Sequence, residues 1–133
     1  MELFEEVVER YAGRILNIHP ALLPAFGGQG MYGVRVHQAV LAAGAEVSGA
    51  TVHYVDEEYD TGTIVAQCPV PVLPEDDAEA LAARVLKVEH RLYPAVVDHV
   101  CSAVAEHRQP DPFVLADIDH VSAIQDDTQP TSR

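Results

Sequence analysis

The chain has 133 residues, of which 48% are hydrophobic and 22% charged, a composition typical of one globular domain and not of a disordered protein. Its 21 acidic residues outnumber its 8 basic ones, and the resulting net charge of −13 repels phosphate backbones, so no nucleic-acid partner is expected. No apolar run approaches the ~18 residues that span a membrane, and the N-terminus is acidic where a signal peptide would be basic, so the sequence predicts a soluble, cytoplasmic protein with no membrane partner.

The first half of the chain predicts a helix, a short strand, a glycine-rich loop and a second helix, over residues 3–12, 15–18, 24–33 and 34–43. The first helix follows from apolar residues at helical spacing, and it ends at Gly13. The strand is short and apolar, and Pro20 and Pro24 prevent a helix from following at once. The loop holds four glycines, too many for a regular element, and it lets the backbone approach another group closely.

The second half predicts a β-hairpin, one long helix and a C-terminal strand. The strands are expected at residues 47–56, 63–72 and 113–121. The helix starts with a capping box formed by Asp76 and Glu79, carries an apolar residue every three or four positions, and is expected to bend at Pro94. We divide the chain into a main unit, residues 1–110, and a C-terminal strand with a polar tail, residues 111–133.

Polar side chains occur at two positions where the pattern of the first strand would favour apolar ones. Asn17 and His19 are two residues apart, so they would project from one face at the carboxyl end of a parallel strand, where open α/β sheets bind their ligands. Asp60 lies in the tip of the predicted hairpin. Each residue also has a structural explanation: a turn cap for Asn17, a backbone hydrogen bond for His19 and a turn position for Asp60.

An amide, an imidazole and a carboxylate together form a set suited to acyl or formyl transfer. The amide can donate to a developing oxyanion, the imidazole can carry a proton near neutral pH, and the carboxylate can orient the imidazole and raise its pKa. Because the set includes no serine, cysteine or metal, the substrate must supply the attacking group. The histidines lack the helix spacing of zinc ligands, so no metal is expected, and Cys68 and Cys101 are predicted to be reduced.

The chain resembles the phosphoribosylglycinamide formyltransferases over roughly residues 10–97, above all in the stretches RILNIHPALLPAFGGQGMYG and VEHRLYP. The resemblance implies an α/β chain that forms the C-terminal catalytic part of a Rossmann-like formyltransferase fold, with a mixed sheet, a β-hairpin and a long C-terminal helix. It also implies transfer of a formyl group from 10-formyltetrahydrofolate to the amine of glycinamide ribonucleotide in purine biosynthesis.

The resemblance assigns roles to individual residues. Asn17 would donate to the oxyanion, His19 would stabilise that charge and relay a proton to the departing folate nitrogen, and Asp60 would tune His19. Glu89 would contact the ribonucleotide, with a solvated helix carboxylate as the alternative explanation. The loop that holds the pterin ring of the folate would include five residues of the hairpin tip: Asp56, Glu57, Glu58, Tyr59 and Gly62.

Two further histidines lie in segments that resemble the family. His53 matches a histidine near the family's catalytic site, but a strand histidine that is hydrogen-bonded in the core explains it nearly as well. His37 also lies in such a segment, and we assign it no chemical role.

The chain departs from the family because the resemblance does not include the N-terminal nucleotide-binding half. That half carries a glycine-rich turn whose amides bind the ribonucleotide phosphate, whereas residues 1–13 here predict only an acidic amphipathic helix. We therefore expect weak or no transferase activity from the isolated chain. We also expect the edge of the strand at 15–18 to find a partner, either in a longer polypeptide or through dimerisation or exchange of elements.

Two alternatives to the transferase remain open at this point. The same three residues could use water as the acceptor, which would make the chain a formyltetrahydrofolate hydrolase and would release formate without an amine. A non-catalytic folate-binding or assembly fragment would instead bind folate analogues and show no turnover with either acceptor.

Overall fold

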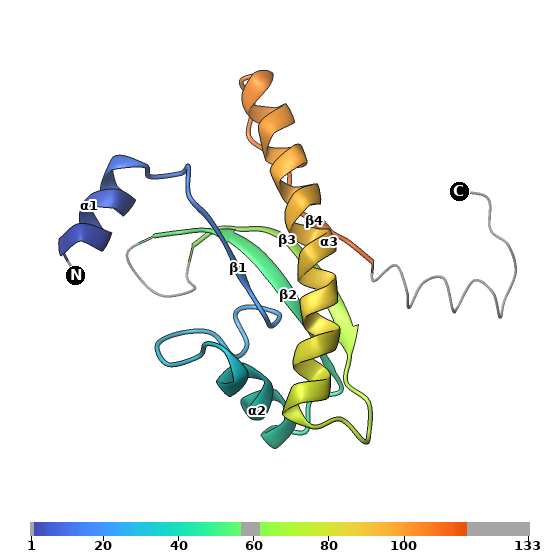
Figure 1. Ribbon diagram of the computed structural model, residues 1–133. Coiled ribbons are helices and arrows are strands. Elements are labelled where there is room, and N and C mark those ends of the chain that lie inside the picture. Colours follow the sequence, from blue (N-terminus) through green and yellow to red (C-terminus); the bar gives the residue numbers. More distant parts are fainter. Residues whose placement is uncertain (1, 57–61, 117–133) are drawn as a thin grey trace, which may run out of the picture.

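The computed structural model describes residues 2–56 and 62–116 (Figure 1). In chain order its elements are α1 (Glu2–Arg10), β1 (Leu16–His19), α2 (Val34–Ala42), β2 (Val47–Tyr54), β3 (Ile64–Pro71), α3 (Ala78–Ala105) and β4 (Phe113–Val114). The strands lie side by side in the order β1-β2-β3-β4; the first two pairings are antiparallel and the third is parallel. The predicted mixed sheet, with its hairpin and long helix, is therefore confirmed.

Helix α3 crosses one face of the sheet, and α2 lies beside the N-terminal half of α3 (Figure 1). The helix continues through Pro94, and its sheet-facing apolar residues are buried: Leu81, Val85, Val88, Leu92 and Val96. They form one core with residues of β2 and β3, among them Val52 and Val70. Burying each such side chain contributes about 1.5 to 3 kcal/mol relative to an exposed position. None of the helices in the described ranges is long and apolar enough to cross a membrane.

Strand β2 is covered on both faces, since its residues 48–53 are all buried. Side chains alternate along a strand, so Val52 points into the core beneath α3 while Thr51 and His53 point to the opposite face. That opposite face is covered by the chain that follows β1, where the backbone N–H of Leu23 donates to Thr51 Oγ1 at 3.0 Å. The sheet thus has an apolar face and a face with polar side chains.

The start of α3 differs from the sequence prediction by one residue. The N-cap is Asp77, whose Oδ1 accepts a hydrogen bond from the Ala80 backbone N–H at 2.8 Å, and not Asp76. Asp76 instead accepts from the Leu73 backbone N–H at 2.8 Å and forms an ion pair with Arg84 at 2.7 Å. The hydrogen bond from Arg84 holds the pKa of Asp76 below its ordinary value, although burial acts in the opposite direction. The Asp76 side chain therefore binds the preceding turn and Arg84 and does not cap the helix.

Two strands show only part of what the sequence analysis expected. Among residues 2–56 and 62–116 the one strand neighbour of β1 is the antiparallel β2, so a parallel neighbour for β1 stays a prediction. Of the strand predicted at 113–121, Phe113 and Val114 pair with β3, and the residues after 116 lie outside the described ranges. The segment before β4 is tied to α3, because His99 Nε2–H donates to the carbonyl oxygen of Asp111 at 2.7 Å and its ring meets that of Phe113 edge to face.

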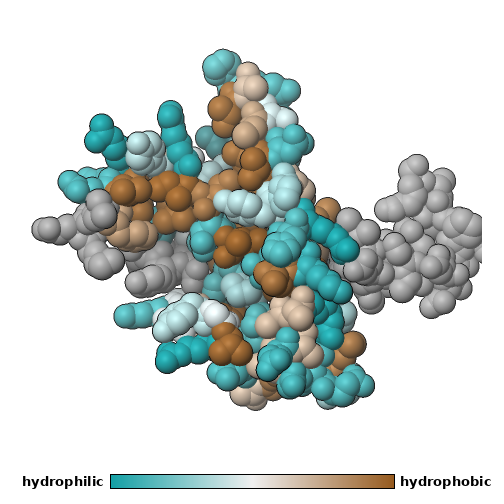
Figure 2. Space-filling view, in the orientation of Figure 1, coloured by the Kyte–Doolittle hydropathy of each residue, from teal (hydrophilic) through white to brown (hydrophobic). Residues whose placement is uncertain are grey.

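Helix α1 is amphipathic and buries only part of its apolar surface. Val8 is buried, whereas Phe4, Val7 and the following Tyr11 are exposed. Figure 2 shows apolar side chains gathered where α1 lies. An exposed apolar cluster of this kind is a surface that another polypeptide segment could cover.

Candidate active site

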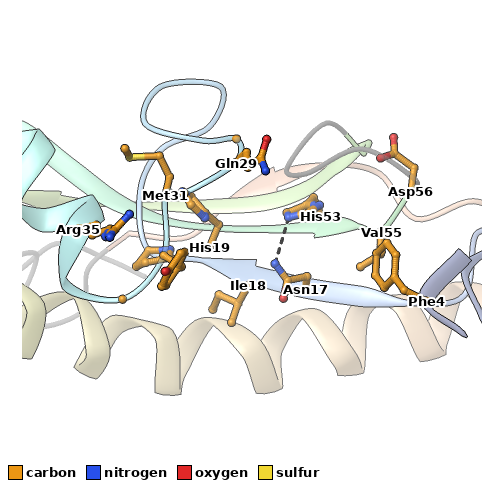
Figure 3. A pocket seen from close by; sticks show the side chains of 15 residues that line it. Phe4, Asn17, Ile18, His19, Gln29, Met31, Arg35, His53, Val55 and Asp56 are labelled. Carbon is orange, nitrogen blue, oxygen red and sulfur yellow. Dashed lines mark hydrogen bonds between the residues drawn. The ribbon is translucent and has the colours of Figure 1, made fainter. Parts of the chain in front are cut away.

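A cavity of about 730 Å³ lies between β1, the glycine-rich loop and the end of β2 (Figure 3). Its polar lining includes Asn17, His19, Gln29, Arg35, His53 and Asp56. Arg35 and Asp56 lie at opposite ends of the cavity in Figure 3, and the guanidinium of Arg35 lies over the Tyr32 ring, 5.4 Å from its centroid. Asn17 and His19, predicted to share a face of the strand, do line one cavity.

Asn17 is held by His53 on the neighbouring strand. The two residues are directly opposite each other in the register of β1 and β2, and 3.3 Å separates Asn17 Nδ2 from His53 Nε2. His53 Nδ1 lies 2.8 Å from the Tyr54 carbonyl oxygen, which can only accept, so Nδ1 carries the proton. In the neutral ring Nε2 then accepts from Asn17 Nδ2. This orientation of the amide leaves Nδ2 a second N–H for another acceptor.

His19 is held by the backbone of the loop that follows it. The side chain is buried, and its Nε2–H donates to the carbonyl oxygen of Phe26 at 2.8 Å. In the neutral ring, Nδ1 is therefore the basic nitrogen. Phe26 has a φ of 58°, in the left-handed region that non-glycine residues rarely adopt. Such a conformation costs about 1 to 3 kcal/mol and persists only where the surroundings determine it.

A second cavity of about 710 Å³ adjoins the first at the base of the β2–β3 hairpin. Val55 and Asp56 line both cavities, and Gly62 lines the second. A Cβ at Gly62 would lie 1.6 Å from the carbonyl oxygen of Tyr54, so only glycine fits there. Two of the predicted folate-loop residues, Asp56 and Gly62, are thus brought to this place.

The remaining residues of the predicted folate loop lie outside the described part of the chain. They are Glu57, Glu58 and Tyr59, and the predicted catalytic residue Asp60 lies beside them. The contact expected between Asp60 and His19 therefore stays a prediction.

Two other titratable residues do not line either cavity. Glu89 is half-buried on α3, and burial raises the pKa of its carboxyl, with nearby His90 acting in the opposite direction. Its predicted contact with a ribonucleotide stays a prediction. His37 is buried in α2, its Nδ1 has no hydrogen-bond partner among the described residues, and its pKa is lowered by burial and then by the charge of nearby His19.

The arrangement can polarise a carbonyl group without forming a covalent intermediate. It provides an oriented amide N–H and an imidazole, and no group of three or more His, Cys, Asp or Glu in residues 2–56 and 62–116 could hold a metal ion. From the sequence, His53 could be either a core residue or part of the site, and the bond from His19 to the Phe26 carbonyl was not predicted. The available signal was a histidine in a strand otherwise suited to the core; a backbone carbonyl leaves no signal in the sequence.

Comparison with known proteins identifies relatives with this fold. A family model described as formyl transferase matches residues 3–97. The chain is 56% identical over 104 residues to "Phosphoribosylglycinamide formyltransferase, chloroplastic" of Arabidopsis thaliana, covering 78% of this chain and 36% of that protein. It is 44% identical to the phosphoribosylglycinamide formyltransferase of Haemophilus influenzae, covering 71% of this chain and 42% of the relative.

Solved structures show the same relationship. The phosphoribosylglycinamide formyltransferase of Anaplasma phagocytophilum superposes with a TM-score of 0.67 at 42% identity, covering 74% of this chain and 44% of the other. The phosphoribosylglycinamide formyltransferase of Brucella melitensis superposes with a TM-score of 0.61 at 54% identity, covering 70% of this chain and 45% of the other. The chain spans less than half the length of each of these four relatives.

Proposed function

Because the chain belongs to the formyl transferase family, we propose that it carries the catalytic part of a phosphoribosylglycinamide formyltransferase and corresponds to the C-terminal portion of that enzyme. The reaction would transfer a formyl group from 10-formyltetrahydrofolate to the amine of glycinamide ribonucleotide. The observation that carries the proposal is the Asn17–His53 pair, which lines one cavity together with His19.

The chemistry follows from the hydrogen bonds that these side chains already make. The substrate amine attacks the formyl carbon, a C–N bond forms, and the carbonyl electron pair moves onto oxygen. Asn17 gives one Nδ2–H to His53 and the other to this oxyanion. Because Phe26 holds the Nε2–H of His19, a protonated His19 presents its second N–H at Nδ1. That proton passes to the folate nitrogen as the old C–N bond breaks, and the proton lost by the amine restores His19.

The donor folate is proposed to bind at the hairpin base. Asp56 and Gly62 line the second cavity, which adjoins the first, so a pterin held there would bring its formyl group toward Asn17 and His19. The resemblance adds Glu57, Glu58 and Tyr59 to this site and gives Asp60 the role of orienting His19. No metal takes part in the proposed reaction.

The acceptor is proposed to approach from the side of Glu89, as the resemblance implies. Residues 1–13, which precede the first strand, contain no glycine-rich turn between a strand and a helix of the kind that binds the ribonucleotide phosphate in the family. Binding of a remote phosphate normally positions the reacting amine. We therefore propose that these residues alone catalyse transfer slowly.

The outer edge of β1 is the proposed place of association. Among residues 2–56 and 62–116, no strand pairs with that edge, and the exposed apolar side chains Phe4 and Val7 lie on the preceding helix. A second copy of the chain or a nucleotide-binding half could cover this edge. Light scattering that shows a monomer with a cooperative melt would count against this. The plant relative is described as chloroplastic, so the cytoplasmic location stays a prediction.

The direct experiment measures both products of a formyl donor. The chain is incubated with 10-formyltetrahydrofolate with and without glycinamide ribonucleotide, and formylated ribonucleotide and free formate are quantified. We expect formylated ribonucleotide that depends on Asn17 and His19. Formate released without the amine would identify a hydrolase, and binding of a folate analogue without either product would identify a non-catalytic fragment.

A further inference from the structure

A hydrogen-bonded network anchors the chain that immediately follows His19. Its centre is Thr51 on β2, whose hydroxyl donates to the carbonyl oxygen of Ala21 at 2.7 Å. Thr51 Oγ1 itself accepts from the backbone N–H of Leu23 at 3.0 Å and from Gln67 Nε2 at 3.0 Å. Gln67, on β3, also donates to the carbonyl oxygen of Leu23 at 2.9 Å. Residues 20–26, here called the anchored loop, are therefore bonded to two neighbouring strands.

The network leaves no spare capacity at its two central groups. A hydroxyl has one donor and two acceptor positions, and all three are used at Thr51. The Gln67 amide nitrogen has two N–H groups, and both are used. Thr51 is fully buried, so any partner that it loses cannot be replaced by bulk water without a rearrangement.

Close packing adds to the hydrogen bonds. A Cβ at Gly49 on β2 would lie 2.3 Å from the Cys68 carbonyl oxygen and 2.6 Å from Leu22 Cδ2. The anchored loop therefore lies directly on the strand at Leu22. Its position is determined both by contact at Leu22 and by directional bonds on either side of it.

The anchored loop ends at the group that holds His19. The carbonyl oxygen of Phe26 accepts the Nε2–H of His19 at 2.8 Å, and the left-handed φ of Phe26 needs support from its surroundings. Neither Thr51 nor Gln67 lines the cavity, so neither is placed to touch a substrate there. Thr51 is also paired with His19 in the register of β1 and β2, whereas Gln67 lies one strand farther away and contacts the segment after His19 only through its bond to Leu23.

We propose that Gln67 is a positioning residue for His19. Together with Thr51 it fixes the anchored loop, the loop fixes the Phe26 carbonyl, and this carbonyl keeps the proton of neutral His19 on Nε2. The basic nitrogen Nδ1 is then the one that exchanges a proton during the reaction. The effect on catalysis rests on the proposed function, whereas the effect on the His19 tautomer does not.

The test replaces Gln67 with a side chain of similar shape that has no amide. In Gln67→Met, the Leu23 carbonyl and Thr51 lose their shared donor. ¹⁵N NMR of the histidine rings, with the His19 signal assigned from a His19→Asn spectrum, reports which ring nitrogen carries the proton. We expect the Nε2–H form of His19 to lose population. We also expect kcat for formyl transfer to fall roughly 10- to 100-fold with little change in KM, because the loop acts on orientation and not on binding.

A matched control separates positioning from a general loss of stability. Val70 is fully buried on the same strand but belongs to the core beneath α3. Val70→Ala should lower the melting temperature and leave the His19 spectrum as in the wild type. A His19 change of equal size in Val70→Ala would overturn the proposal.

A pair of Thr51 variants provides the second arm, which also serves if Gln67→Met does not fold. Thr51→Ser keeps the hydroxyl and should keep the wild-type His19 spectrum, whereas Thr51→Val keeps the shape, loses the hydroxyl and should change it. Folded Gln67→Met or Thr51→Val protein with an unchanged tautomer overturns the proposal. If the variants change the His19 tautomer but the wild-type chain transfers no formyl group, positioning by Gln67 is supported and the proposed function is not. The two claims can therefore fail separately.

Discussion

The two faces of β2 are built on different principles. On the face toward α3, Val52 and its neighbours meet a continuous apolar surface in which contacts have no preferred direction. On the other face, Thr51 and His53 each bond to a defined atom of another segment. One strand thus provides a stable core on one side and an oriented site on the other.

The difference between the faces predicts different consequences of substitution. Loss of an apolar contact lowers the free energy of unfolding but leaves the remaining side chains free to relax. Loss of a buried hydrogen-bonding partner leaves a specific polar atom unsatisfied and releases whatever that atom oriented. Variants of the α3 face should therefore change stability, and variants of the opposite face should change chemistry.

The largest expected effect is at His19. His19→Asn removes the imidazole and should lower the formyl-transfer rate about 100- to 10,000-fold, as expected for loss of a general acid–base group. The measurement is single-turnover transfer with the chain in excess. His107→Asn, at an exposed histidine after the end of α3, is the control and should retain the wild-type rate. A wild-type rate in His19→Asn would contradict the claim that side chains of the polar face take part in the reaction.

The apolar face should respond to Leu92→Ala. Leu92 is fully buried in the core, so the substitution should lower the free energy of unfolding by about 2 to 5 kcal/mol, measured by urea titration. Leu86→Ala removes the same side chain from an exposed position on the same helix and should cost less than about 0.5 kcal/mol. Equal losses in the two variants would contradict the placement of the core.

A smaller, pH-dependent effect is expected at the start of α3. The pKa of Asp76 is lowered by its bond to Arg84, so its contribution to stability is present above the ordinary carboxyl pKa of about 3.9 and is lost as the pH falls through the lowered folded-state value. Asp76→Asn should cost about 1 to 3 kcal/mol at pH 7, and this cost should shrink in acid. The measurement is denaturant unfolding of the wild type and of Asp76→Asn, from pH 7 down through the carboxyl pKa.

The matched control for this pair is Asp98→Asn, at an exposed position farther along α3. Its cost at pH 7 should be small, as is usual for a substitution at an exposed position. A cost for Asp76→Asn that stays constant into acid would show that the Asp76–Arg84 bond does not stabilise the folded state in solution.

The sequence predicted the apolar face well because repeating patterns carry that information. The spacing of apolar residues in α3 predicted that helix and its buried side, and two strand-like runs separated by a short polar stretch predicted the hairpin. Asn17 and His19 were predicted to share one face. The prediction of Asp76 as N-cap was wrong because two adjacent aspartates both satisfy the local pattern, and the ion pair with Arg84 decides between them.

The polar face could be predicted only in part, since its bonds join residues far apart in the chain. Asn17 and His53 are 36 positions apart, and Gln67 and Leu23 are 44 apart, so no local spacing reveals either contact. The antiparallel pairing of β1 with β2 likewise depends on long-range contacts. The role of Asp60 stays a prediction, because it lies outside the described residues.

The most direct test of the proposed site is the rate of formyl transfer by Asn17→Ala. This variant removes the oriented N–H while leaving His19 and its Phe26 partner in place. Single-turnover transfer should slow about 100- to 1,000-fold, as for loss of one oxyanion donor, with unchanged binding of a folate analogue. Transfer at the wild-type rate would contradict the assignment of the Asn17–His53 pair to the reaction.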